Sequence, residues 1–241
     1  MSQNPRQSKS IRAQLLTAMQ VGEYAHCDRL PRESVLSEML GISRTQLRDI
    51  LASLDREGFI TRRHGVGTII NRHVLGAPAR MDIEVEFLDM IRQSGHTPGV
   101  AFVRAADDKA DSKVAAQLGI PTGTPILRIS RLCTADGRPA IYCEDVVEKA
   151  LAKGNYTIKD FKLPIFHFLQ QFCGIYPYLD LTDLRPVVAD AALAEIFQIP
   201  MGSPLLNMDE VDFDIDGKPV FCSTEYFVDG IFRHTVMRKK L

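Results

Sequence analysis

Apolar residues recur at helical spacing in three successive segments near the start of the chain. The spacing predicts a helix over about 11–19, a second over about 33–40 that ends at Gly41, and a third that begins near Ser43. The apolar faces are Ile11, Leu15, Leu16 and Met19 in the first helix, Val35, Leu36, Met39 and Leu40 in the second, and Leu47, Ile50, Leu51 and Leu54 in the third. We therefore expect three short helices packed around one small core.

The start of the third helix carries the sharpest local signal. Ser43 and Gln46 have the spacing of a capping box, in which each side chain satisfies a free backbone N–H of the other residue. The buried stripe leaves Thr45 and Arg48 on the outward side of this helix. Because a helix N-terminus attracts phosphate, and because arginine can also pair with guanine, this helix start is a candidate surface for nucleic acid.

A basic hairpin is expected directly after the third helix. Two short strand-forming runs, 59–61 and 68–70, flank the segment 62–67, in which Gly65 and Gly67 allow positive φ angles and a close backbone approach to DNA. Helices followed by such a hairpin form a winged helix-turn-helix, which presents the start of its last helix to the major groove. The pattern therefore predicts sequence-specific binding to double-stranded DNA.

Residues 11–73 resemble the DNA-binding domain of the GntR family of bacterial transcription regulators. The matching elements are Leu30-Pro31, Glu33, Leu40-Gly41, Ser43-Arg44-Thr45, Arg48, Leu51, Leu54, Gly58 and His64-Gly65-Val66-Gly67. The family usually has Arg where this chain has Ser34, and Arg32 is the candidate replacement. Resemblance and wing chemistry together give these candidate DNA contacts: Arg32, Arg44, Thr45, Gln46, Arg48, Arg62, Arg63, His64, Gly65 and Gly67. For each charged residue alone, the alternative is a solvated surface position.

The second half of the chain contains a weak internal repeat. Residues 110–127 align with 189–206, and the identities are Ala110, Asp111, Ala115, Ile120, Pro121, Gly123, Pro125 and Leu127 in the first copy. Each copy continues into a strand, a turn at Asp136-Gly137 or Asp216-Gly217, and a further strand. A repeated helix and hairpin predict an α+β domain, with helices on one side of an antiparallel sheet.

This repeated pattern resembles the ligand-sensing UTRA domain of the HutC branch of the GntR family, which shares the chorismate lyase fold. The anchors are Gly123-Thr124-Pro125, Arg131, Asp136-Gly137, Pro139, Glu144, Gly202-Ser203-Pro204, Asp216-Gly217, Pro219, Ser223, Tyr226 and Asp229. The resemblance implies a small-molecule effector site, for which the candidates are Arg131, Cys133, Glu144, Phe166, Tyr176, Arg185, Ser223, Glu225 and Tyr226. The alternative for Arg131 and Glu144 is a mutual ion pair across the hairpin.

The departures from this resemblance bear on the effector. Sugar-phosphate sensors of this branch tend to have polar side chains where this chain has Cys133, Pro164, Phe166 and Phe227. Burying an anion without partners costs several kcal/mol, so a phosphate needs several donors. We therefore expect an effector other than a sugar phosphate, such as a carboxylate or an amine-bearing metabolite.

Charge divides the chain in the same way. Residues 1–75 have a formal charge of +4 and residues 76–241 a formal charge of −5, which suits phosphate contact in one half and another role in the other. The predicted organisation is a flexible tail over 1–10, a DNA-binding domain over 11–73, a linker over 74–82, and an effector-binding and dimerisation domain over 83–241.

The remaining chemistry narrows the function further. The five cysteines have no CxxC or zinc-ligand spacing, and no signal-peptide core or long apolar run is present, so we expect a cytoplasmic protein without metal, cofactor or membrane partner. No catalytic motif supports an enzyme, although a lyase-like fold keeps that alternative, and a constitutive architectural DNA-binding protein is another. The sequence favours a ligand-responsive homodimeric repressor released from a palindromic operator.

Overall fold

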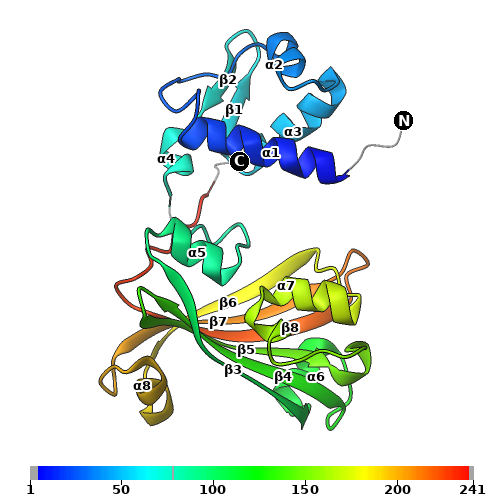
Figure 1. Cartoon of the computed structure of the whole chain (residues 1–241), viewed down its shortest axis with the longest axis vertical. Helices are drawn as coiled ribbons and strands as arrows, with labels where there is room; N and C mark the ends of the chain where they lie inside the picture. The colour runs from blue at the N-terminus through cyan, green and yellow to red at the C-terminus, as the bar shows by residue number, and fades with distance from the viewer. Residues whose placement is uncertain (1–4, 78, 239–241) are drawn as a thin grey trace. The chain divides into compact units, whose positions relative to one another are not determined.

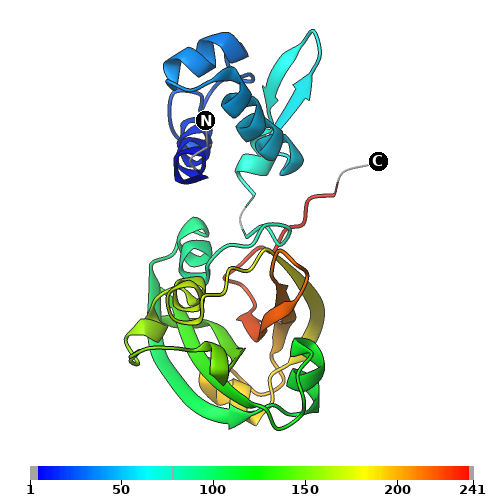
Figure 2. The ribbon, with the colours of Figure 1, turned by 90° about the vertical axis from the view of Figure 1, so that its right-hand side faces the viewer.

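The computed structural model describes residues 5–77 and 79–238 of the chain, which form two compact units. The first comprises Met1–Glu84 together with His234–Leu241, and the second comprises Val85–Arg233. The sequence analysis placed residues 83–241 in one domain, whereas in the structure the residues from His234 onward group with the first unit. Figures 1 and 2 show the elements of each unit.

The first unit is a winged helix-turn-helix. Its elements are α1 (Pro5–Gln20), α2 (Glu33–Met39), α3 (Arg44–Arg56), β1 (Ile60–Arg63), β2 (Gly67–Ile70) and α4 (Arg72–Leu75). The helical stripes predicted from the sequence meet in one core, formed by Ile11, Leu15, Met19, Tyr24, Leu30, Leu36, Leu47, Ile50, Leu51, Leu54, Ile60 and Ile70. Burial of this apolar surface is the main stabilising term for so small a unit.

Two local expectations for this unit are wrong. Helix α1 begins at Pro5, so residues 5–10 are helical and not part of a tail; the expected tail over 1–4 lies outside the described residues. Proline suits the first turn of a helix, where its missing N–H has no intrahelical partner, and no breaker follows it before Gln20. The other error is the inward orientation of Val35 and Met39, which are 47% and 56% exposed.

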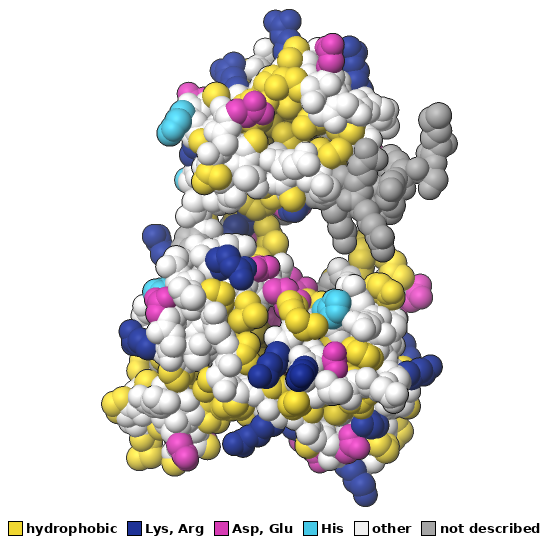
Figure 3. Space-filling view, in the orientation of Figure 1, with side chains coloured by type: hydrophobic (Ala, Val, Ile, Leu, Met, Phe, Trp, Pro, Cys, Tyr) yellow, Lys and Arg dark blue, Asp and Glu magenta, His cyan; other side chains and the backbone are white. Residues whose placement is uncertain are grey.

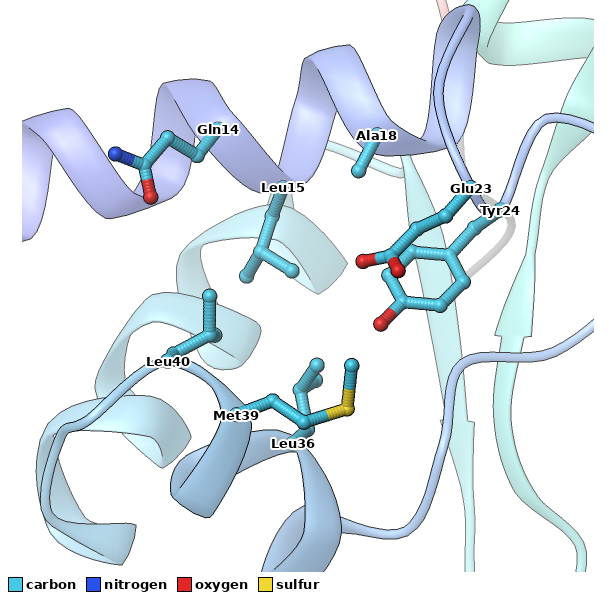
Figure 4. A pocket seen from close by; sticks show the side chains of 8 residues that line it. All are labelled: Gln14, Leu15, Ala18, Glu23, Tyr24, Leu36, Met39 and Leu40. Carbon is cyan, nitrogen blue, oxygen red and sulfur yellow. The ribbon is translucent and has the colours of Figure 1, made fainter.

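The exposure of Met39 follows from the short length of α2. Among the apolar side chains of this helix only Leu36 is buried, since seven residues make just under two turns and present one narrow face. Met39 instead borders a hollow of about 180 Å³ between α1 and α2, beside Leu36, Leu40 and Tyr24 (Figure 4). This hollow is a packing gap at the rim of the core.

The segment that leaves the DNA-binding unit and the end of the chain pair with each other. Thr235 N donates to Ala79 O at 3.1 Å, and Met81 N donates to Thr235 O at 2.8 Å. Arg80 is 7% exposed, and its Nη1 donates to Glu57 O, at the C-terminal cap of α3, at 2.7 Å. Its guanidinium also lies 4.9 Å from the centre of the Phe59 ring and pairs with Asp82. Arg80 thus links the paired segments around residues 79–82 and Thr235 to the C-terminal end of α3.

The second unit is an antiparallel six-stranded sheet with helices on both faces, so the expectation of helices on one side is wrong. Its strands are β3 (Pro98–Lys109), β4 (Pro125–Ala135), β5 (Arg138–Glu148), β6 (Leu179–Val188), β7 (Pro204–Phe213) and β8 (Pro219–Val228), in the spatial order β3-β4-β5-β8-β7-β6. The helices are α5 (Phe87–Gln93), α6 (Ser112–Leu118), α7 (Ile165–Phe168) and α8 (Ala191–Phe197). The short turns are η1 (Lys149–Leu151), η2 (Asp160–Lys162) and the π-helical η3 (Leu169–Cys173).

The internal repeat in the sequence is a repeat in the structure. Strand β3, helix α6 and the hairpin β4–β5 are followed later by β6, α8 and the hairpin β7–β8, and the two halves meet where β5 pairs with β8. Asp111 caps α6 by accepting from Val114 N, and Asp190 caps α8 by accepting from Leu193 N, both at 2.8 Å. The mixed helix and sheet fold predicted from the sequence is confirmed.

The sheet has two different faces. Helices α6 and α8 pack on one face, against residues such as Ile126, Val146 and Leu132. The segment from η1 to η3, with α7, packs on the other face, against Leu127, Ile129, Val147 and Phe221 (Figure 1). We call this second face the sensor face. Because side chains alternate along a strand, a shift of one residue in the sequence moves a side chain from one face to the other.

Candidate DNA interface and effector site

The start of α3 presents polar side chains to solvent. Ser43 caps the helix by accepting from Gln46 N at 3.1 Å, as the capping-box spacing predicts. Arg44, Thr45 and Arg48 are exposed, and Gln46 is partly buried. These side chains stand at the N-terminus of the helix, where the helix dipole favours an anion. The arrangement suits contact with a DNA backbone and the bases beside it.

The wing supplies a second group of cations. Arg62, Arg63, His64 and Gly65 are exposed around the turn between β1 and β2, where Gly65 has a φ of 75° and Gly67 a φ of 105°. A hollow of about 740 Å³ lies at the base of the wing and is lined by residues of 29–33 and 62–68, Arg32 among them. Arg side chains gather at the end of the unit where the wing and α2 lie (Figure 3). The candidate DNA contacts therefore share one surface.

Two residues of this surface escaped the sequence analysis as functional candidates. Arg29 Nη1 donates to Val66 O at 3.0 Å and so holds the wing turn. Glu33 accepts from Arg48 Nε at 2.8 Å and from Arg62 Nη2 at 2.9 Å. Glu33 was visible as a matching element of the family, but its link to two arginines depends on a tertiary contact that no spacing reveals.

The sensor face carries a buried ion pair in the middle of its apolar surface. Arg131 and Asp145 are 5% and 1% exposed, and Arg131 Nε and Nη2 lie 3.1 and 2.9 Å from Asp145 Oδ2. Ser223 Oγ donates to Asp145 Oδ1 at 3.1 Å, and Arg131 Nη1 donates to Leu163 O, just before α7, at 3.4 Å. Buried charges are tolerated only with such partners, so this cluster needs a reason beyond packing.

Three further carboxyl groups surround this ion pair. Glu86 lies beside the start of α7, and burial raises its pKa to about 7. Cys143 pairs with Arg131 on one neighbouring strand and with Glu225 on the other, so Glu225 lies on the same face as Arg131, and it is 4% exposed. Burial, and then the neighbouring Glu210, raise the pKa of Glu225 well above its ordinary value, while burial and the nearby Asp180 raise the pKa of Glu210 to about 7. Carboxyl groups outnumber cations in this site.

The structure brings only some of the predicted effector residues together. Arg131, Cys133, Ser223 and Glu225 share the sensor face, and Phe166 packs on it from α7. Glu144, Tyr226 and Arg185 lie on the opposite face, where Tyr142 Oη donates to Glu144 at 2.8 Å and Arg185 pairs with Asp209. Tyr176 is 66% exposed.

The alternative pairing of Arg131 with Glu144 is wrong. Arg131 pairs with Asp145, the residue next to Glu144 in sequence, and Glu144 lies 3.7 Å from Arg128 on the opposite face. Strand alternation decides this outcome, since Arg131 faces Cys143 across the ladder and Asp145 projects from the same side as Cys143. The sequence analysis therefore missed Asp145, Glu86 and Glu210. The alternation along 138–148 was the signal that could have found Asp145.

Neither unit offers a metal site or a membrane span among the described residues. No group of three or more His, Cys, Asp or Glu side chains there could hold a metal ion. None of the helices is both long and apolar enough to cross a membrane.

A winged helix joined to a sheet domain with a buried polar site defines a class, the ligand-linked transcription regulators. Comparison with known families agrees: the description "Bacterial regulatory proteins, gntR family" matches residues 7–70, and "UTRA domain" matches residues 93–232. The chain belongs to the GntR family of bacterial regulators and carries a UTRA domain.

Similar proteins cover both units. An uncharacterised HTH-type transcriptional regulator of Rhizobium meliloti (strain 1021) is 24% identical over 92% of this chain and 91% of its own length. The HTH-type transcriptional repressor NagR of Bacillus subtilis (strain 168) is 26% identical over 81% of this chain and 79% of its own. The HTH-type transcriptional repressor PhnF of Mycolicibacterium smegmatis is 29% identical over 53% of this chain and 50% of its own.

Solved structures show the same fold. The possible transcriptional regulator YydK from Bacillus subtilis superposes with a TM-score of 0.75 at 18% identity, over 97% of this chain and 99% of that one. PhnF from Mycobacterium smegmatis superposes with a TM-score of 0.60 at 20% identity, over 96% of this chain and 100% of that one.

Proposed function

We propose that this protein is a repressor of the HutC branch that leaves its operator when a small metabolite binds the sensor face. The observation that carries the proposal is the buried cluster around Arg131 and Asp145, because an apolar sheet face has no structural need for an ion pair and several carboxyl groups. The repressor role is supported by the names of the similar proteins NagR and PhnF. No sequence motif for catalysis favours an enzyme.

The DNA contacts that we propose follow the exposed surface of α3 and the wing. Arg44, Thr45 and Arg48 would reach the major groove with the start of α3, and the hairpin residues Arg62, Arg63, His64 and Gly65 would contact the backbone beside it. Arg32 and Gly67 line the hollow at the base of the wing, and Gln46 lies at the cap of α3. Phosphate contacts would make the affinity fall steeply with salt.

The charge of the sensor face indicates the class of effector. Arg131 Nε donates to Asp145 Oδ2 and Nη2 lies 2.9 Å from the same oxygen, so a carboxylate already neutralises the charge that would attract a phosphate. The Asp145 carboxylate would repel a doubly charged anion in a medium of low dielectric, and Glu86 and Glu225, whose pKa values burial raises, supply no positive charge to hold one. The same carboxyl groups would accept hydrogen bonds from an ammonium or guanidinium group. We therefore infer that the effector carries a basic group and is not a sugar phosphate.

The proposed active form is a homodimer, and the edge strand β6 supports it. Six large apolar side chains exposed between residues 176 and 188 lie on or beside this strand: Tyr176, Tyr178, Leu179, Leu181, Leu184 and Val188. The other edge strand, β3, exposes small residues and charged residues of both signs instead. An open edge with apolar side chains invites pairing with another chain, and a second copy of β6 presents the same surface. A dimer would place two α3 helices on a pseudo-palindromic operator.

Fluorescence anisotropy tests the proposal with the full chain. The labelled probe is a duplex that the protein itself selects from random-sequence DNA, and the panel contains amines, carboxylates and sugar phosphates. Release of this duplex by a basic metabolite supports the repressor and the effector class together. Calorimetric binding of a hexose 6-phosphate in the micromolar range would refute the effector class. Specific binding that no compound alters would favour the constitutive architectural protein.

A further inference from the structure

Glu33 connects three parts of the DNA-binding surface. It is the first residue of α2, and its two carboxylate oxygens accept hydrogen bonds from different arginines. Oε2 accepts from Arg48 Nε on α3 at 2.8 Å, and Oε1 accepts from Arg62 Nη2 on β1 at 2.9 Å. One carboxylate therefore holds the guanidinium of the recognition helix and that of the wing at once.

This arrangement contributes little to folding stability. Arg48 is 63% exposed at its side chain, Arg62 is 33% exposed and Glu33 is 28% exposed. Ion pairs so open to water contribute little to the free energy of folding. The hydrogen bond from Arg48 holds the pKa of Glu33 below its ordinary value, so Glu33 is ionised at neutral pH. The larger consequence lies in where the two guanidinium groups are held, and in the negative charge between them.

The hydrogen bonds leave part of each arginine available. Glu33 engages the Nε of Arg48, so the Nη1–Nη2 edge of that guanidinium points away from the carboxylate. This edge is the fork that pairs with O6 and N7 of guanine. A phosphate that competes for Arg48 or Arg62 must displace a carboxylate, and it approaches a negative charge as it does so. Random DNA offers only phosphates, whereas a correct site also offers base edges.

We propose that Glu33 is a specificity-determining residue of the DNA interface. It orients Arg48 and Arg62, and its charge weakens binding to DNA of the wrong sequence. The protein would then discriminate in two ways: the arginines attract the correct DNA sequence, and the charge of Glu33 disfavours an incorrect one. The inference rests on the DNA contacts proposed above for Arg48 and Arg62.

The first test is the salt dependence of binding to random-sequence duplex DNA. Glu33→Gln removes the charge and keeps the size of the side chain, and Glu38→Gln, at an exposed position of the same helix, is the matched control for net charge. With both arginines released to phosphates, Glu33→Gln should bind random DNA roughly three- to tenfold more tightly, and the log–log salt slope should steepen by about 1–2, at about 0.9 per phosphate. Equal slopes for Glu33→Gln and Glu38→Gln would overturn the proposal.

The second test is sequence selection from a random pool. Glu33→Gln should enrich a less strict consensus than the wild type at the base pair nearest Arg48, with an unchanged thermal unfolding midpoint. Glu33→Asp keeps the charge but is one methylene shorter, so it should lose base preference without a steeper salt slope. If Glu33→Gln selects the wild-type consensus, the proposal is wrong. A wild-type protein that selects no consensus would refute the proposed base contacts. If Glu33→Gln still steepened the salt slope in that case, the failure would concern the base contacts and not the effect of the Glu33 charge.

Discussion

Arg131 and Asp145 form an ion pair in which both side chains are buried. Their exposed fractions are 5% and 1%, and Arg131 Nη2 lies 2.9 Å from Asp145 Oδ2. The pair stands on neighbouring strands of the sensor face, with Ser223 completing the coordination of the carboxylate. Each ion has lost most of its water, so each depends on the other.

Loss of one member of this pair should be costly. Arg131→Met should reduce the free energy of unfolding by about 3–5 kcal/mol, because it leaves the Asp145 carboxylate buried without its cation. Urea denaturation of the full chain measures the change. The control is Arg92→Met, which breaks the exposed pair with Asp89 and should cost less than about 1 kcal/mol. Similar losses for the two variants would show that the buried pair does not depend on mutual charge.

The raised pKa of Glu86 predicts a pH dependence of stability. Its folded value is about 7 against an ordinary 4.5, so the folded state binds the proton more tightly than the unfolded state. The stabilisation from this group is complete below pH 4.5 and is lost as the pH rises towards 7. Glu86→Gln should therefore flatten the fall of the thermal unfolding midpoint between pH 5 and pH 8.

Glu195→Gln, at an exposed position of α8, is the control for this experiment. It should leave the pH profile of the wild type unchanged. Glu210, whose pKa is also raised to about 7, and Glu225, whose pKa is raised well above its ordinary value, should act in the same direction as Glu86, so a flat profile requires the loss of all three carboxyl groups. A profile of Glu86→Gln that is as steep as the wild type would contradict the burial of this carboxyl group.

Arg48 is the side chain from which we expect direct base contact. Arg48→Ala should weaken operator binding by about 1–3 kcal/mol and relax the preference at one base pair, if its fork reads guanine. A contact to phosphate would instead weaken all sequences alike and reduce the salt slope by about 1. Arg56→Ala, an exposed arginine at the far end of α3, should change neither property. Anisotropy titrations against the selected duplex and a scrambled duplex distinguish these outcomes.

The edge strand β6 predicts the effect of a charge on assembly. Leu181 is 67% exposed, and Leu181→Lys should shift the protein from dimer to monomer, since a lysine on an edge strand opposes pairing with another chain. Sedimentation equilibrium measures the molecular mass in solution. Ala101→Lys introduces the same charge on the exposed part of the other edge strand, β3, and should leave the mass unchanged. A monomeric wild type, or a dimeric Leu181→Lys, would exclude this interface.

Local patterns in the sequence predicted most of the fold. The stripe of Leu47, Ile50, Leu51 and Leu54 and the cap at Ser43 are local consequences of helix geometry, so they could be derived without tertiary information. The same holds for the repeated caps at Asp111 and Asp190. By contrast, the direction in which Val35 and Met39 point depends on which neighbours α2 meets, and a seven-residue helix has too few turns to decide it.

The candidate sites were less accessible to sequence reasoning because they are assembled across strands. Resemblance pointed to Arg131 but not to Asp145, although the two residues touch. The register of β4 and β5 decides which of two adjacent acids, Glu144 or Asp145, meets Arg131. Glu86 joins the site from outside the sheet. A one-dimensional pattern cannot fix such register and approach, even when it identifies the strands.

The attachment of the C-terminal segment has a consequence for synthesis of the protein. Thr235 pairs with Ala79 and Met81, and Arg80 beside them holds the carbonyl of Glu57 at the end of α3. A ribosome makes residues 234–238 only after the entire sheet domain has emerged. The DNA-binding unit therefore gains these contacts long after its own sequence has been translated. A nascent chain that stops within the sheet domain would carry a DNA-binding unit that lacks the hydrogen bonds of Thr235 with Ala79 and Met81.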